Sequence, residues 1–279
     1  MSEFSVPSQE DFFQESCRFL TTCRAECSCS NAWHFMWSGF KASGRRRSIY
    51  YQQPLLKKML APMRQSIRSV LIAGAADAGI LTVLDSIFRE NVRYVALDIC
   101  NAPAVEMKWY ANLRGLSIEF QKIPLEQFVP QEKFDLIFIS NTFIFMQTDV
   151  VFQALRQLQQ GLRTDSWMVC GMRYEQKVQE NSPATPEASA KDFRSMISKT
   201  YTSRPDLVAL IEPHIDPYFE SMRLTQRHPY EPVEFASILD ATGYRSVDHF
   251  RDDITPTNIL NTVSRGSITL SDVHLLQLK

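Results

Sequence analysis

The stretch Val70-Leu-Ile-Ala-Gly-Ala-Ala-Asp-Ala-Gly79 decides the fold class of this chain. The apolar run from Ser69 to Ala73 predicts a buried parallel strand, because such strands carry few polar residues on either face. Gly74 and the small residues after it predict a tight turn, and the apolar stripe from Ile80 to Phe88 predicts a helix. A small-residue turn between a strand and a helix lets a ligand approach the backbone.

The rest of the chain repeats this alternation of strand and helix. Strands are expected at 92–97, 118–120, 134–139, 167–171, 245–250 and 273–278. Helices are expected at 103–113, with Gly115 just past its end, after an N-cap at Thr148 up to Gly161, and from Pro232 to a cap at Gly243. Such alternation predicts an α/β fold, with a mostly parallel, doubly wound Rossmann-like sheet and helices on both faces. Ligands of such folds bind at the carboxyl ends of the strands.

Two regions lie outside this pattern. Residues 1–66 are expected to form an N-terminal helical cap, with helices at 9–22 and 50–61, the second interrupted by Pro54. The aromatic cluster at 33–37 must pack on a core or a ligand. Residues 67–279 form the Rossmann-like domain, with a polar, partly helical insertion at about 173–231 that would act as a lid.

Composition and charge exclude several classes of function. The 279 residues carry a formal charge of −1, so no overall basic field attracts nucleic acid or an anionic membrane. Arg45 to Arg47 form the one concentrated positive run, which is typical of a solvated turn. No apolar stretch is long enough to span a bilayer, and the acidic N-terminus is unlike a secretory signal, so we expect a cytoplasmic protein.

The cysteines do not predict a metal site. Four of the six, Cys17, Cys23, Cys27 and Cys29, are spaced C-x5-C-x3-C-x-C, which is not the paired C-x2-C pattern of structural zinc. We therefore expect reduced thiols and no metal ligands.

Polar residues at two further strand ends suggest a cofactor site. Asp98 ends the second strand, 24 positions after Gly74, where a carboxylate can accept hydrogen bonds from ribose hydroxyls. Ser140 and Asn141 follow the strand Phe134-Asp-Leu-Ile-Phe-Ile139. A nicotinamide enzyme of the same fold is disfavoured, because the G-x-G-x-x-G signature is absent.

From residue 69 to about 172, and less closely to 279, the sequence resembles the class I S-adenosylmethionine-dependent methyltransferases. The resemblance rests on the glycine turn, the acidic end of strand two, the F-D-L-I strand and the C-terminal Ala-Thr-Gly-Tyr segment. It implies a seven-stranded sheet with a reversed last strand, and S-adenosylmethionine as cofactor. It also implies site residues around the methionine part (Gly74, Ala75, Ala76), the ribose and adenine (Asp98, Ile99, Ile123, Pro124, Leu125) and the sulfonium (Ser140, Asn141).

The sequence departs from the family pattern at two places. Ala76 and Ala78 replace glycines of the usual G-x-G-x-G, and Ile72 stands where strand one often carries an acid. Alanine fits such a turn where φ stays negative. A non-catalytic binding or regulatory protein with the same fold therefore remains an alternative.

A cap built from the chain's own helices favours a small-molecule acceptor, methylated at oxygen, nitrogen or carbon, for example in secondary metabolism. A methyltransferase acting on RNA or protein is the third hypothesis, and the composition does not predict the basic face that RNA binding would need. Candidate catalytic residues are His228 and Tyr51, with His34, His214, Tyr50 and Tyr230 as further candidates for a base or a ligand contact. The oligomeric state is not predicted.

Overall fold

A seven-stranded sheet organises the residues that this computed structural model describes, namely 7–18, 33–42, 52–88, 91–177, 186–224, 230–252 and 267–279. Its order across the sheet is β3-β2-β1-β4-β5-β7-β6. The strands are β1 (Ser69–Ala73), β2 (Arg93–Asp98), β3 (Ser117–Lys122), β4 (Phe134–Ser140), β5 (Leu162–Lys177), β6 (Tyr244–Asp252) and β7 (Ser267–Leu278). All the predicted strands are therefore present.

The direction of the strands agrees with the predicted sheet. The pairs from β3 to β5 are parallel, whereas β7 runs antiparallel to both β5 and β6. The last strand is thus the reversed one. Two strands are longer than predicted, because β5 and β7 stay paired from Met168↔Leu276 to Lys177↔Ser267. The predicted insertion from 173 is corrected here: its first residues continue β5, since the backbone ladder extends past the apolar core that the sequence pattern detects.

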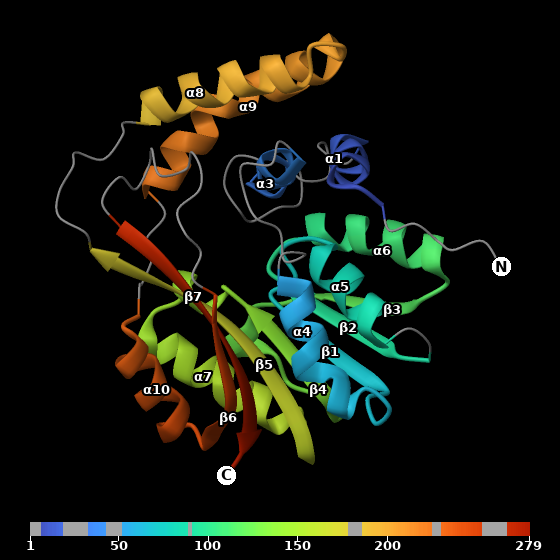
Figure 1. The fold of residues 1–279 in the computed structure, drawn as a ribbon, viewed down its shortest axis with the longest axis vertical. Helices are drawn as coiled ribbons and strands as arrows, with labels where there is room; N and C mark the ends of the chain where they lie inside the picture. The colour runs from blue at the N-terminus through green and yellow to red at the C-terminus, as the bar shows by residue number, and fades with distance from the viewer. Residues whose placement is uncertain are drawn as a thin grey trace.

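Helices cover both faces of the sheet (Figure 1). On one face lie α4 (Gln53–Leu60), α5 (Gly79–Phe88) and α6 (Ala102–Arg114), and on the other α7 (Thr148–Gln160) and α10 (Pro232–Ala241). Successive residues of β1 supply both cores: Val70 and Ile72 pack with the first set, Leu71 and Ala73 with the second. Within the described residues, short 3₁₀ helices also join these elements, namely η2 (Ala61–Met63), η3 (Leu125–Gln127) and η4 (Phe143–Phe145).

Helix ends follow local chemistry, with two shifts from the prediction. Gly115 ends α6 in the left-handed conformation, as expected. Thr148 is the first residue of α7, whose N-cap is Gln147. Pro54 lies in the first turn of α4 and does not interrupt it, because the missing N–H has no partner to lose there.

Four further helices form a layer of their own. They are α1 (Gln9–Arg18), α3 (Trp33–Ala42), α8 (Pro186–Thr200) and α9 (Pro205–Leu224). Phe13 and Met36 of the N-terminal pair are buried with Phe193 of α8 and Ile211 of α9 in a third apolar cluster. In Figure 1, α8 and α9 lie on the side of the sheet toward which β5 points. The N-terminal helices therefore pack against the insertion helices as well as the Rossmann-like core.

The aspartate of the F-D-L-I strand has a structural position. Asp135 accepts hydrogen bonds from the backbone N–H groups of Arg68 (2.8 Å) and Ser69 (2.9 Å) and pairs with Arg163. Burial raises the pKa of Asp135, but these donors outweigh it and the pKa is lowered. This carboxylate thus ties the start of β1 to β4, at the end of the sheet opposite the predicted site.

Among the described residues, no helix combines the length and apolar character needed to cross a membrane.

Candidate functional site

The turn after β1 is held by its neighbours on both sides. The N–H groups of Gly74 and Ala75 both donate to the carbonyl oxygen of Leu97, at 2.9 Å. Gly74 has φ +75°, and a Cβ there would lie 2.2 Å from the Oγ1 of Thr142, beyond the end of β4. Glycine is therefore required at this position, both for its backbone conformation and for the close approach of Thr142.

Ala76, two residues after Gly74, contradicts the expectation that the alanines of this turn have a negative φ. Ala76 has φ +49°, whereas Ala75 is not in the positive-φ region. The condition under which alanine suits this turn therefore fails at Ala76, because a left-handed backbone brings Cβ too close to the following carbonyl. The backbone at Ala76 thus has the conformation that a glycine would adopt, and the alanine is strained in it.

Asp98 lies at the centre of the candidate site. Its Oδ2 accepts a hydrogen bond from the Ala76 N–H (3.1 Å), and its Oδ1 accepts one from the Cys100 N–H (2.9 Å). A carboxylate has about four acceptor positions, so two backbone donors leave room for two more hydrogen bonds. The side chain is 10% exposed. Asp98 is thus oriented by the turn while it retains capacity for hydroxyl donors.

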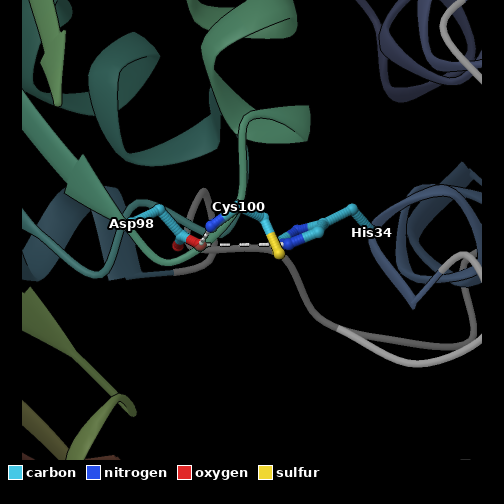
Figure 2. A group of neighbouring side chains, drawn as sticks. All are labelled: His34, Asp98 and Cys100. Carbon is cyan, nitrogen blue, oxygen red and sulfur yellow. Dashed lines mark hydrogen bonds and ion pairs between the residues drawn. The ribbon is translucent and has the colours of Figure 1, made fainter. Parts of the chain in front are cut away.

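His34 of α3 points toward this carboxylate, with Cys100 between them (Figure 2). Its Nδ1 lies 2.7 Å from the Ala76 carbonyl oxygen, which only accepts, so Nδ1 carries the proton. Its Nε2 is 4.0 Å from Oδ1 of Asp98. Burial lowers the pKa of His34, but a hydrogen bond with Cys100 and the charge of Asp98 outweigh it, so the pKa is raised above 6.5.

A second contact fastens α3 to the same turn. The Nε1–H of Trp37 donates to Oδ2 of Asp77 (3.2 Å), while Oδ1 of Asp77 accepts from the Gly79 N–H at the start of α5 (2.6 Å). Sequence reasoning named His34 only as a possible base and missed this docking. No periodic signal links α3 to a turn some 40 residues away, so only the tertiary structure reveals it.

A buried carboxylate joins the N-terminal helices to the same region. Glu106 of α6 accepts hydrogen bonds from the hydroxyls of Ser16 in α1 and Ser38 in α3, the latter at 2.8 Å. Its other oxygen accepts from the Ala78 N–H (3.3 Å). Four elements therefore meet at one side chain, which sequence reasoning did not identify.

The residues predicted around the adenine lie together at the ends of β2 and β3. Ile123 donates its N–H to the Asp98 carbonyl (2.9 Å), so the loop after β3 runs beside Asp98. Ile99 is half exposed, whereas Leu125 is buried in the core and Pro124 precedes the short helix η3. The Leu125 side chain thus lies in the core beneath the residues predicted to flank the adenine.

Ser140 and Asn141 lie at the end of β4, as predicted. Asn141 has φ +54° and donates its N–H to the Gly171 carbonyl (2.8 Å). Its Nδ2 lies 3.3 Å from the Ser140 hydroxyl, and its buried Oδ1 has no hydrogen-bond partner among the described residues. A Cβ on Gly171 would lie 2.8 Å from the Ser140 hydroxyl. A strained backbone and an unsatisfied buried acceptor are typical of a ligand site.

Several predicted residues are elsewhere or undescribed. Tyr51 and His228, with Tyr50, Cys23, Cys27, Cys29 and the run Arg45 to Arg47, lie outside the described residues. Tyr230 is buried and donates its hydroxyl hydrogen to the Met146 carbonyl (2.9 Å), and burial raises its pKa. His214 is buried in α9.

The candidate site around Asp98 also has the ligand types for a metal ion. Atoms of His34, Asp98 and Cys100 lie within 4.8 Å of one another. Both oxygens of Asp98, however, already face backbone N–H donors, and Nδ1 of His34 faces Ala76. This arrangement suits hydroxyl groups better than a cation.

Several solved structures with the same fold are methyltransferases. An S-adenosylmethionine-dependent methyltransferase from Clostridium acetobutylicum superimposes with TM-score 0.53 and 8% identity, over 88% of this chain and 97% of that one. The 1,6-didemethyltoxoflavin-N1-methyltransferase of Burkholderia thailandensis, solved with that compound and S-adenosylhomocysteine, gives 0.51 and 13%, over 99% and 93%. An S-adenosylmethionine-dependent methyltransferase of Leishmania major gives 0.51 and 10%, over 99% and 88%.

A comparison with the models of known protein families found no match, and neither did one with curated proteins. The solved structures show that the chain has the Rossmann-like fold of class I methyltransferases. Their sequence identities to this chain are so low that they establish the fold alone.

Proposed function

We propose that this chain transfers a methyl group from S-adenosylmethionine to a small-molecule acceptor. The observation that carries the proposal is Asp98, which two backbone N–H groups hold at the end of β2 with acceptor capacity left for two hydroxyls. The vicinal hydroxyls of a ribose are donors that match this capacity. Neighbours of the same fold include an enzyme solved with S-adenosylhomocysteine, which supports this choice of cofactor.

The remaining residues fit the cofactor from one end to the other. The turn from Gly74 to Ala76 would border the methionine part, and Ile99 with the loop at 123–125 would flank the adenine. Asn141 brings a buried Oδ1 acceptor to the end of β4, where the sulfonium and the amino group would lie. The cofactor supplies an electrophilic methyl group on its sulfonium. The chain's own task is to orient an acceptor in line with it and to exclude water.

The helical layer suits that task. The helices α1, α3, α8 and α9 pack on one another through Phe13, Met36 and Phe193, and α3 reaches the turn through His34. With α3 docked, Asp98 is 10% exposed and Nε2 of His34 lies 4.0 Å from its Oδ1, so a ribose has little access to it. We infer that α3 moves when the cofactor enters, and that a closed layer limits the acceptor to a small molecule. The bound 1,6-didemethyltoxoflavin of the Burkholderia enzyme is an acceptor of that size.

A second candidate is a non-catalytic protein that kept the fold. Two observations favour it: the strained Ala76 replaces a glycine of the turn, and Asp98 is only 10% exposed with His34 beside it. This protein would fold without binding S-adenosylmethionine.

Calorimetry of the purified protein with S-adenosylmethionine and with S-adenosylhomocysteine separates the two. We expect both to bind, and Asp98→Ala to weaken binding by about 1–3 kcal/mol, the range for a hydrogen bond to a charged group, or roughly 5- to 150-fold. The control is Asp165→Ala, which removes an exposed carboxylate at the other end of β5 and should leave binding unchanged.

Absence of binding to folded wild-type protein would favour the non-catalytic candidate. Equal affinity in wild type and Asp98→Ala would refute the role of Asp98. Where the cofactor binds, release of S-adenosylhomocysteine in the presence of a panel of small phenols, amines and carbon acids tests the transfer itself.

A further inference from the structure

A second cluster of ligating side chains lies on the hairpin of β6 and β7. His249 and His274 are directly paired residues of the two strands, and Asp272 lies two positions before His274 on the same face. Ligand atoms of these three residues all lie within 4.8 Å of one another. The three residues come together because β6 pairs with β7, and no sequence motif predicts this pairing.

This cluster is separate from the cofactor site. From β4, which Asn141 directly follows, the sheet order runs through β5 and β7 to β6, so Asp272 and His274 on β7 are two strand spacings away, about 10 Å, and His249 on β6 is three away, about 14 Å. That distance is too long for His249 to remove a proton from a small acceptor at the methyl group. The cluster therefore needs an explanation of its own.

We propose that His249, Asp272 and His274 bind a divalent transition-metal ion such as Zn²⁺. Two imidazoles and one carboxylate are a ligand set of zinc and related ions, which leaves further coordination positions for water or a ligand. Asp272 is 1% exposed, and a cation beside a carboxylate so deeply buried offsets the cost of removing its charge from water. The site does not depend on the proposed methyl transfer.

The geometry of the cluster is close to what an ion requires. Nε2 of His249 lies 3.0 Å from Oδ2 of Asp272. Two ligand atoms that share a tetrahedral ion at about 2.1 Å lie about 3.4 Å apart. The two imidazole rings are stacked, with centroids 4.6 Å apart, so one ring must turn for both nitrogens to face one ion. The His249 side chain is 41% exposed and therefore has room to turn.

Surrounding groups support a ligand role for His274. The Tyr174 hydroxyl lies 3.3 Å from Nε2 of His274, in the position of an outer partner that orients a ligating imidazole. The Phe235 ring of α10 packs against the same imidazole, with centroids 6.2 Å apart. The His274 side chain is thus held in place by its neighbours, whereas the exposed His249 leaves the site open to an ion from solvent.

Equilibrium dialysis of chelator-treated full-length protein with Zn²⁺, repeated with Co²⁺ and its visible absorption, tests the proposal. We expect one equivalent per chain at this site, and a Kd at least tenfold higher in His249→Ala, whose side chain is too exposed for its loss to unfold the chain. Asp272→Asn should show the same loss, and circular dichroism checks the fold of each variant. The matched control Asp248→Asn, which changes the exposed carboxylate just before His249, should bind like wild type.

Two results would overturn the proposal. One is the absence of bound ion in wild type above the level of His249→Ala. The other is binding with unchanged stoichiometry and affinity in both His249→Ala and a second variant, His249→Gln, which would put the ion elsewhere in the chain, for example on cysteine sulfurs.

Discussion

Replacing Ala76 by glycine should stabilise the protein, although glycine normally destabilises. At φ +49° a non-glycine residue costs roughly 1–2 kcal/mol, and the greater freedom of glycine in the unfolded chain costs roughly 0.5–1 kcal/mol. The difference is a gain of about 0.5–1 kcal/mol. Because a chain of this size shifts by roughly 2–4 °C per kcal/mol, Tm should rise by about 1–4 °C.

The neighbouring alanine supplies the matched control. Ala75 is fully buried and has no positive φ, so Ala75→Gly loses a packed methyl group, about 0.8 kcal/mol, as well as the glycine entropy. It should destabilise by about 1–2 kcal/mol. Urea unfolding followed by circular dichroism measures both variants. Equal destabilisation by the two substitutions would refute the reasoning, because it would mean that Ala76 carries no backbone strain.

Three further predictions concern the same site and sheet. Gly74→Ala should lower the free energy of unfolding by at least about 2 kcal/mol, because its Cβ meets Thr142 at a positive φ. Gly115→Ala has open space around its Cβ and should lower it by only about 1 kcal/mol. Unfolding curves that rank the two variants the other way would contradict this. The raised pKa of His34 predicts a stabilisation that is complete below about pH 6.5 and lost as the pH rises through the folded-state value. This dependence should vanish in His34→Gln when Tm is measured against pH. The lowered pKa of Asp135 predicts the opposite: a contribution present above about pH 3.8 and lost as the pH falls through the folded-state value, so Asp135→Asn should flatten the acid limb of the stability curve.

The order of strands and helices in the Rossmann-like core was predictable because it depends on local pattern. The run from Ser69 to Ala73, the turn at Gly74 and the left-handed end at Gly115 are all recorded in consecutive residues. The carboxyl ends of parallel strands meet at one edge of the sheet, so the sequence predicts that Asp98 and Asn141 lie at the same edge.

The lengths of β5 and β7 and the position of Thr148 at the start of α7 were harder to predict from the sequence. These features depend on backbone hydrogen bonds made outside the apolar core. The positive φ of Ala76 was not predictable at all, because the residue type argues against it. The reason the chain adopts it lies in the contacts around it: the Ala76 N–H reaches Asp98, and its carbonyl reaches His34.

The sequence alone determined the α/β class, the strand order along the chain and the edge where a ligand would bind, because periodicity and turn residues act over a few neighbouring positions. Tertiary structure alone decided what lies over that edge. The docking of α3 on the turn, the burial of Glu106 beneath Ser16 and Ser38, and the meeting of His249 with Asp272 join segments that no local pattern connects. Such contacts arise only when the whole chain packs, since each buried polar group must then find its partner wherever the fold supplies one.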